Sequence, residues 1–138
     1  MADKARDVMS DDCTCIDEKA SILEAAKLLR ERGVGALPIC GEDDRLKGML
    51  TDRDIVVKVL AEGRSPGATV AGDLAQGKPV TIGADDSLEE TMRTMAEHKV
   101  RRLPVIDGHR LVGIVAQADL ARALDPERSG ELLAAVSE

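Results

Sequence analysis

The amino-acid sequence predicts an α/β (α+β) fold built from two β-α-β-β-α repeats with pseudo-two-fold symmetry. Three features of the chain predict it. The chain matches itself when it is shifted by 66 residues, and by 65 residues after a one-residue deletion in the second copy. Each copy has a serine followed three residues later by a glutamate, which is typical of a helix start. Each copy then has two apolar runs separated by turn residues, which predict a β-hairpin.

The internal repeat sets the domain organisation. Thirteen pairs of positions are identical in this register, among them Pro38 with Pro104 and Asp54 with Asp119. One register kept over about fifty-five positions indicates a duplicated supersecondary unit. The expected parts are two domains at residues 5–61 and 71–124, a linker rich in glycine, serine and proline at 62–70, and a C-terminal helical tail at 125–138.

The first half of each repeat is expected to be a short strand followed by a helix. The short strands are predicted at residues 14–16 and 80–82. The helices begin at Ser21 and Ser87, each of which forms a capping box with the glutamate three residues later. Apolar residues at i, i+3, i+4 and i+7 predict the buried face of the first helix, which contains Ile22, Ala25, Ala26 and Leu29. The buried face of the second helix is expected to contain Leu88, Met92 and Met95.

The second half of each repeat is expected to be a hairpin followed by a helix. The strands are predicted at residues 36–40, 45–51, 102–106 and 110–116, and the closing helices at 53–61 and 117–124. A last helix at 126–136 starts at Pro126 and contains Leu132, Leu133 and Val136. A three-stranded sheet with helices on one face leaves its other face open. The two copies are therefore expected to pack these faces together, with a cleft on each side of the symmetry axis.

Composition excludes several classes of function. The 138-residue chain has no phenylalanine, tyrosine or tryptophan and a net charge of −7. It lacks the aromatic residues that stack on bases, and its charge repels phosphate backbones, so no nucleic-acid partner is expected. No apolar run reaches the roughly 20 residues of a membrane span, and the N-terminus lacks an apolar signal core. We therefore expect no membrane association and a cytoplasmic location.

The chain has three cysteines, Cys13, Cys15 and Cys40. Neither histidine is near them in the sequence, and a structural zinc site usually has four ligands, so no metal site is expected. Small buried thiols and a redox-linked pair remain open as alternatives. The sequence has no Ser/His/Asp or Cys/His pattern typical of catalysis and no glycine-rich phosphate loop, so the protein is not expected to be an enzyme.

The hairpin and helix segments of both copies resemble a known family. LPICGEDDRLKGMLTDRD, residues 37–54, and LPVIDGHRLVGIVAQAD, residues 103–119, are similar to cystathionine β-synthase (CBS) domains, whose tandem pair is called a Bateman module. The resemblance covers about residues 5–124, and the first segment also resembles the stand-alone hypoxic response protein group. The resemblance implies a non-enzymatic regulatory module that requires no cofactor. Such modules bind adenine nucleotides (AMP, ADP, ATP or S-adenosylmethionine) in the clefts between their repeats.

The family pattern assigns roles to individual positions. The aspartate of an S/T-x-x-D motif bonds the ribose hydroxyls, basic residues before the second strand contact phosphate, and the first short strand frames the base. The matching positions of this chain are Thr51, Asp54, Arg101, Arg102, Asp119, Ile16 and Ile82. The match is divided, because copy one has Gly35 and Ala36 in place of the basic pair, and copy two has Ala116 in place of the hydroxyl residue. Thr51 and Asp54 also fit a helix N-cap, so both interpretations remain open.

The CBS arrangement also implies that Cys15 and Cys40 can form a disulfide, because the strands that carry them are neighbours about 4.8 Å apart in one sheet. Cys13 competes as the partner. The equivalents of Cys15 and Cys40 in copy two, Thr81 and Ile106, carry no sulfur, so the sheet does not require cysteine at these positions.

Family modules associate through the last helix of each copy, which implies a homodimer. The apolar surface is expected to contain Ile55, Val56, Val59, Leu120 and Leu124. The chain shows no effector domain, so a regulated protein is expected to be a separate partner. Three functional classes remain open: a nucleotide sensor in a hypoxia or stress response, a structural or interaction protein with degenerate clefts, and a redox-responsive dimer that acts through Cys15 and Cys40.

Overall fold

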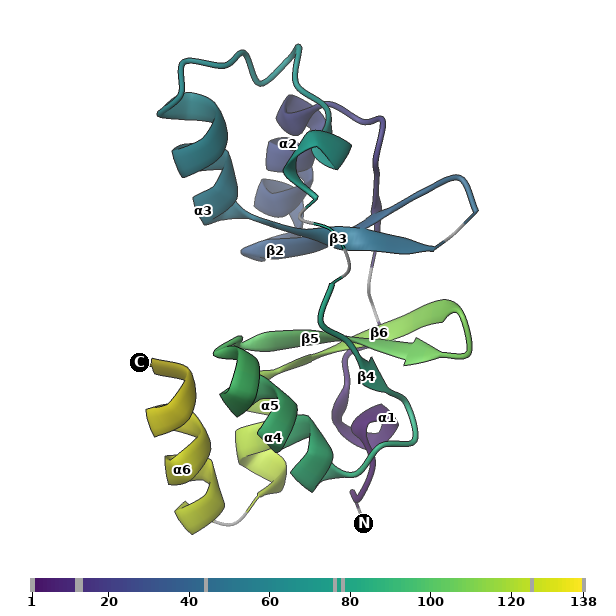
Figure 1. The fold of residues 1–138 in the computed structure, drawn as a ribbon, viewed down its shortest axis with the longest axis vertical. Helices are drawn as coiled ribbons and strands as arrows, with labels where there is room; N and C mark the ends of the chain where they lie inside the picture. Colours follow the sequence, from purple (N-terminus) through teal and green to yellow (C-terminus); the bar gives the residue numbers. More distant parts are fainter. Residues whose placement is uncertain are drawn as a thin grey trace. The chain divides into compact units, whose positions relative to one another are not determined.

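The chain folds into two units, each built on one three-stranded sheet (Figure 1). This computed structural model describes residues 2–11, 14–43, 45–75, 77, 79–124 and 126–137. The first-repeat unit is Thr14–Pro79, and the second-repeat unit combines Met1–Cys13 with Val80–Glu138. The two sheets and the helices that accompany them confirm the predicted α/β (α+β) fold class.

The first-repeat unit has a sheet of order β1-β2-β3, in which β1 is parallel to β2 and β2 is antiparallel to β3. Its elements are β1 (Ile16–Asp17), α2 (Ile22–Arg32), β2 (Ala36–Cys40), β3 (Leu46–Thr51), α3 (Asp52–Asp54), the π-helix η1 (Ile55–Leu60) and the 3-10 helix η2 (Ala71–Leu74). Ser21 caps α2 as predicted, because its Oγ accepts a hydrogen bond from Glu24 N at 3.1 Å. The helix ends where Gly33 adopts a left-handed conformation with a φ of 64°.

The second-repeat unit repeats this plan with a sheet of order β4-β5-β6. Its elements are α1 (Ala5–Val8), β4 (Ile82–Gly83), α4 (Leu88–His98), β5 (Arg102–Asp107), β6 (Arg110–Ala116), α5 (Gln117–Ala123) and α6 (Pro126–Ser137). Ser87 caps α4, because its Oγ accepts a hydrogen bond from Glu90 N at 3.0 Å. At the end of α4 the left-handed residue is Lys99, with a φ of 53°, where the first repeat has a glycine.

Each unit has its own hydrophobic core, built entirely without aromatic rings. The core of the first-repeat unit contains Ile16, Ile22, Ala25, Leu29, Leu37, Ile39, Leu50, Ile55, Val59, Ala71 and Leu74. The core of the second-repeat unit contains Ala5, Ile82, Ala84, Leu88, Met95, Leu103, Val105, Val115 and Leu120. Ala26 and Met92, which were predicted on the buried helix faces, lie half-buried at the edges of these cores.

The first short helix of each repeat packs into the unit that contains the sheet of the other repeat. Ala5 N donates to Asp86 O at 2.9 Å, so α1 is fixed to the second-repeat unit. Ala71 N donates to Ala20 O at 2.8 Å, so η2 is fixed to the first-repeat unit. Ala5 and Ala71 are equivalent in the internal repeat, and both are 0% exposed. The sequence repeats at 5–61 and 71–124 are therefore offset from the compact units.

Several predicted elements have different bounds in the structure. The short strands predicted at 14–16 and 80–82 lie at Ile16–Asp17 and Ile82–Gly83, where they meet two residues each of β2 and β5. The closing helix of the first repeat begins at Asp52, because Thr51 rather than Asp52 is its N-cap. In the described parts of the chain, no helix is both long and apolar enough to cross a membrane.

The apolar surface expected for a dimer is largely internal. Ile55, Val59 and Leu120 are 8%, 0% and 0% exposed and belong to the two cores, so their prediction as surface residues is wrong. Ile55 and Val59 are four residues apart, so they share one face of η1, and that face belongs to the core of the first-repeat unit. The exposed apolar side chains of η1 are Val56, Val57 and Leu60, at 56%, 43% and 55%.

The second repeat lacks this exposed apolar turn. Leu124 is half-buried and packs against the core of its own unit. The last predicted helix is present as α6, which packs against α4 and α5 (Figure 1). In the described part of the second-repeat unit, α6 thus packs on the two helices α4 and α5. In the first-repeat unit, η1 has three exposed apolar side chains.

Candidate functional site

The first repeat places Thr51 and Asp54 at the junction of β3 and α3. Thr51 Oγ1 accepts a hydrogen bond from Asp54 N at 3.1 Å, and Thr51 N donates to Asp54 Oδ2 at 3.1 Å. These two bonds form a capping box, so the helix-capping interpretation is correct for both residues. The other carboxylate oxygen, Oδ1, lies 3.4 Å from Lys58 Nζ. The Asp54 side chain is 20% exposed, so it remains reachable from solvent.

The second repeat holds Asp119 in the same way without a hydroxyl. Ala116 N donates to Asp119 Oδ2 at 2.9 Å, which corresponds to the bond between Thr51 N and Asp54. Asp119 Oδ1 accepts from Arg122 Nη2 at 2.6 Å, and its side chain is 22% exposed. The second oxygen of Asp119 is therefore engaged more closely than that of Asp54.

A loop before the second strand lies beside each of these helix starts. Gly35 O accepts from Asp52 N at 3.0 Å, and Arg101 O accepts from Gln117 N at 2.7 Å. The structure therefore brings Arg101 and Arg102 to the same end of β5 and β6 as the start of α5, which carries Asp119. Both arginines are exposed, and neither forms an ion pair or a side-chain hydrogen bond with another described residue.

The corresponding loop of the first repeat has the opposite charge. A Cβ placed on Gly35 would lie 3.3 Å from Asp52 Oδ2, so the Asp52 carboxylate lies directly against this loop. Asp54 follows two residues later. The Asp52 carboxylate therefore lies against the loop that carries Arg101 in the second repeat. Sequence comparison identified the missing basic pair but gave no signal for the approach of Asp52 to Gly35.

The predicted base-framing residues, Ile16 and Ile82, are buried in the cores of their own units, at 7% and 5% exposed. Their side chains therefore hold β1 and β4 in place. A ligand beside either strand would meet the backbone and the flanking residues.

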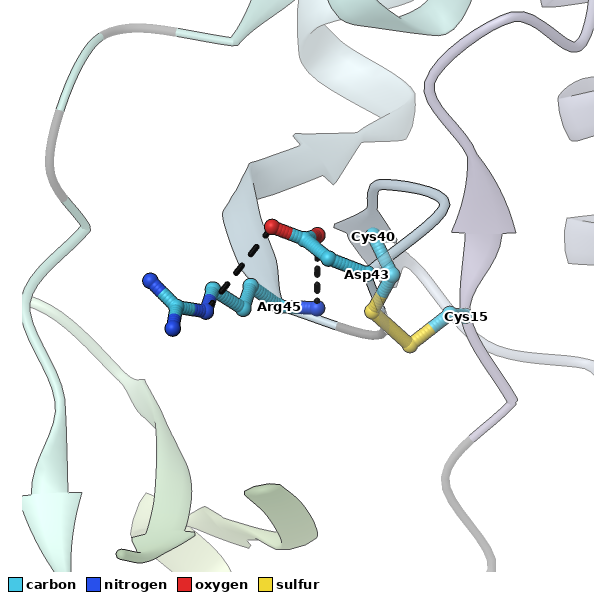
Figure 2. Close-up of a disulfide and its surroundings, with 4 residues drawn as sticks. All are labelled: Cys15, Cys40, Asp43 and Arg45. Atoms are coloured by element: carbon cyan, nitrogen blue, oxygen red, sulfur yellow. Dashed lines mark hydrogen bonds and ion pairs between the residues drawn. A yellow bond between two sulfur atoms is a disulfide. The ribbon is translucent and has the colours of Figure 1, made fainter. Parts of the chain in front are cut away.

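The first-repeat unit contains a disulfide between Cys15 and Cys40, whose Cα atoms are 5.7 Å apart (Figure 2). Cys13, the competing partner, lies outside the described residues. Beside the disulfide, Asp43 Oδ1 accepts a hydrogen bond from Arg45 N at 3.2 Å (Figure 2). This backbone donor is the main reason that the pKa of Asp43 lies below its ordinary value, and the nearby Lys47 adds to the effect.

The second-repeat unit has a charge cluster that anchors the N-terminal segment. Arg6 Nε lies 2.9 Å from Asp85 Oδ1, and Arg6 Nη2 lies 3.4 Å from Asp107 Oδ2. The hydrogen bond to Asp85 is the main cause that raises the pKa of Arg6, and the same bond lowers the pKa of Asp85. Arg6 and Asp85 are 79 residues apart in the sequence, so no local pattern could predict their contact.

A shallow pocket of about 320 Å³ lies in the second-repeat unit, away from the predicted positions. Its lining residues are Ala2, Asp3, Ser87, Leu88, Glu89, Ala123 and Leu124. In the described parts of the chain, no three histidine, cysteine, aspartate or glutamate side chains come together as a metal site requires.

Comparisons with known proteins agree with this architecture. A family model described as "CBS domain" matches residues 5–61 and 71–126. "Hypoxic response protein 1" of Mycobacterium tuberculosis is 53% identical over 125 residues, which are 91% of this chain and 87% of that protein. The crystal structure of "Hypoxic Response Protein I" with two coordinated zinc ions superposes with a TM-score of 0.82 at 52% identity, and covers 88% of this chain and 99% of that chain.

Two further solved structures contain adenosine compounds. CBSX2 in complex with AMP has a TM-score of 0.75 and 28% identity, and covers 87% of this chain and 94% of that chain. The CBS domain pair of protein MJ0100, in complex with 5'-methylthioadenosine and S-adenosyl-L-methionine, has a TM-score of 0.76 and 28% identity over the same shares. The family match to both repeats and the identity over most of the chain lead to one conclusion: the chain belongs to the CBS-domain family, as a tandem pair related to hypoxic response protein 1.

Proposed function

We propose that this chain is a non-enzymatic regulatory module that senses an adenine nucleotide. The observation that carries the proposal is the equivalent placement of Asp54 and Asp119. Each aspartate caps a helix with one carboxylate oxygen, keeps its side chain partly exposed, and lies near the loop before the second strand. An ionised carboxylate in such a place can accept hydrogen bonds from both hydroxyls of a ribose. Structures of two relatives contain adenosine compounds, which supports this ligand class.

The two repeats offer different groups, each to a nucleotide bound at its own helix start. Asp54 is the stronger candidate for the ribose, because its outer oxygen lies 3.4 Å from Lys58, whereas that of Asp119 lies 2.6 Å from Arg122. Arg101 and Arg102 are the candidates for phosphate, because the carboxylate of Asp52 lies at the corresponding loop of the first repeat. A nucleotide with phosphate should therefore bind more tightly than adenosine.

Calorimetry and thermal unfolding with AMP, ADP, ATP, S-adenosylmethionine and adenosine test the proposal, with GMP as the control for base identity. A ligand that binds the folded state raises the melting temperature by mass action. Asp54→Asn preserves the size of the side chain and should weaken binding by about 1.5–3 kcal/mol, since it removes a charge-assisted hydrogen bond. Asp119→Asn should have a smaller effect. Absence of any shift with all five adenine compounds would contradict the proposal.

The second candidate function is that of an interaction protein, and the exposed turn of η1 favours it. Val56, Val57 and Leu60 form an apolar turn on the first-repeat unit. We propose that two copies join here as an isologous homodimer, in which the same residues of each copy face one another. Arg122 occupies the position of Val57 in the second repeat, so Val57→Arg is a substitution that this helix position accepts.

Light scattering of the wild type and of Val57→Arg at equal concentration tests the dimer. The wild type should have twice the mass of the 14.7 kDa chain, and Val57→Arg should have the mass of one chain. Leu133→Arg serves as the control, because it places the same charge at an exposed apolar residue of α6. A wild type with the mass of one chain, or a Val57→Arg variant that stays dimeric, would contradict this interface.

The biological setting that we propose is a cytoplasmic response to hypoxia or stress, in which the dimer acts on a separate protein. The support is the 53% identity to hypoxic response protein 1. Quantitative co-purification with wild type and Val57→Arg, from cells grown with and without oxygen limitation, would identify a partner and show whether it requires the dimer.

A further inference from the structure

The disulfide lies directly after the chain passes from one unit into the other. Ser10 and Ile114 exchange two backbone hydrogen bonds, at 2.9 and 3.0 Å, which fix the end of the N-terminal segment to the second-repeat unit. The first-repeat unit begins at Thr14, and Cys15 is bonded to Cys40 one residue before β1. The disulfide therefore holds the chain to the first sheet at the entrance to that unit.

The C-terminal side of β1 is fixed without the disulfide. Glu18 N donates to Cys40 O at 2.9 Å, and Glu18 O accepts from Gly72 N at 2.8 Å. Two residues later, Ala20 O accepts from Ala71 N at 2.8 Å. This side of the strand is thus bonded both to β2 and to η2, and it stays in place when the sulfur–sulfur bond is opened.

The N-terminal side of β1 has fewer contacts. The β1–β2 ladder contains only two residue pairs, the first of which is Ile16 with Ile39. Thr14 and Cys15 make no further hydrogen bond to any described residue outside this ladder. The disulfide is therefore the main attachment of the residues that enter the first-repeat unit.

The second repeat shows that the same strand pairing forms without sulfur. Its ladder also has two pairs, Ile82 with Val105 and Gly83 with Ile106, in the register of the first repeat. Thr81 and Ile106 occupy the positions of the two cysteines. Reduction should therefore leave the first sheet folded and release only the residues before β1.

The two sulfurs differ in their access to a reductant. Cys40 is 6% exposed, whereas Cys15 is half-buried at the edge of the sheet. Attack by a thiolate should therefore occur at Cys15 Sγ, with Cys40 as the leaving thiolate.

We propose that the Cys15–Cys40 bond is a reversible redox tie, which a dithiol reductant opens while the first-repeat unit stays folded. The thiolate of the dithiol attacks Cys15 Sγ, the bond to Cys40 breaks, and the Cys40 thiolate takes up a proton. The second thiol of the reductant then attacks the mixed disulfide and displaces Cys15, which is protonated in turn. Two electrons pass from the dithiol to the protein, and the reductant leaves as a cyclic disulfide; the oxidised form of the reductant reverses both steps.

The experiment is hydrogen exchange of the full-length chain, equilibrated at several ratios of reduced to oxidised dithiothreitol. A peptide map under non-reducing conditions measures the fraction of Cys15–Cys40 bond in each sample. The amide of Ile16, at the first pair of the β1–β2 ladder, should exchange at least about tenfold faster when the bond is open, because release of the residues before it lets this end of the ladder open locally. Amides of Ile39 on the central strand β2 and of Leu50 on β3 should keep their protection, because the β2–β3 pairing does not depend on the disulfide, and re-oxidation should restore the slow exchange.

The variant Cys15→Thr with Cys40→Ile is the matched control, because it installs the residues of the second repeat. It should show the fast exchange at Ile16 at every redox ratio, and the equivalent Ile82 should not respond in either protein. Three results would overturn the proposal: a bond that opens only together with loss of protection at Leu50, a reduced protein with unchanged exchange at Ile16, or a bond formed by Cys13 in place of Cys15.

Discussion

The two repeats begin the same helix with different chemistry. In the first repeat the Thr51 hydroxyl caps the helix and the Asp54 carboxylate returns the bond, whereas in the second repeat Asp119 acts alone beside Ala116. The loops next to them also differ, with Asp52 against one loop and Arg101 at the other. The two repeats thus share the backbone fold and the aspartate at the helix start. The threonine hydroxyl and the two cysteines occur only in the first repeat, and the arginine pair before the second strand occurs only in the second repeat.

The largest expected effect tests the stability that the disulfide gives to the first repeat. Cys15→Thr with Cys40→Ile should lower the free energy of unfolding by about 3 kcal/mol in the chain-entropy model, for a bond that spans 25 residues of sequence. Chemical denaturation under oxidising conditions measures it. The reciprocal variant, Thr81→Cys with Ile106→Cys, should stabilise the second repeat. If neither variant changes stability, the two sheets do not differ in the way proposed.

The next effect concerns the cap that only the first repeat has. Thr51→Ala should destabilise the chain by roughly 1 kcal/mol, because Asp54 N loses the hydroxyl acceptor. Ala116→Thr should restore the missing cap in the second repeat and raise the free energy of unfolding by a similar or smaller amount. Urea denaturation of both variants and the wild type gives the comparison. Stability changes of the same sign would show that the two helix starts are not equivalent.

A smaller effect is expected at the ends of α2 and α4. Gly33 adopts a φ of 64°, and Lys99 adopts a φ of 53° at the equivalent position. Glycine has no steric penalty in this conformation, so Lys99→Gly should stabilise the chain by roughly 0.5–1 kcal/mol. Gly33→Lys should destabilise it by a comparable amount. Thermal unfolding checks both, and a loss of stability in Lys99→Gly would mean that the lysine side chain makes a contact that outweighs the strain.

The smallest effect is the pH dependence that the pair of Arg6 and Asp85 gives to the second-repeat unit. Bonding to Arg6 lowers the pKa of Asp85 in the folded state from its ordinary value of 3.8. The stabilisation is therefore full above pH 3.8 and is lost as the pH falls through the lowered pKa. The difference in melting temperature between wild type and Arg6→Met should be constant near neutral pH and shrink below pH 3.8. A difference that grows on acidification would contradict this sign.

Local patterns in the sequence predicted the helix starts and the strands well. Ser21 and Ser87 cap α2 and α4 because a serine hydroxyl can accept from the N–H three residues later wherever the helix packs. The predicted capping boxes are only half formed, since among the described residues the structure shows the bond to serine and not the return bond to Glu24 or Glu90. Thr51 and Asp54 were singled out for the same spacing, and the structure places them at a helix start. The capping hydrogen bonds at these helix starts join residues that are close in sequence, so a local sequence pattern can predict them.

Other features depend on neighbours that are distant in sequence. Ile55 and Val59 fit either an outer or an inner helix face by spacing alone, and packing against the rest of the first core sets which face is buried. The approach of Asp52 to Gly35 and of Arg6 to Asp85 comes from packing between elements. Alternation and capping carry no information on such contacts, so the sequence could not predict the charge around each site.

Helix α1 belongs to the second-repeat unit and η2 to the first-repeat unit, and this arrangement affects the order of folding during synthesis on the ribosome. Chains emerge from the N-terminus, and units fold as they become complete. The first-repeat unit ends at Pro79, so it can close while the second repeat is still being made. Residues 2–11 leave the ribosome before both sheets, yet Arg6 must wait 79 residues for Asp85 and 101 residues for Asp107. The N-terminal segment of α1 is thus among the last parts to pack, and a nascent protein stalled after Pro79 carries a complete first-repeat unit while α1 still lacks its contacts.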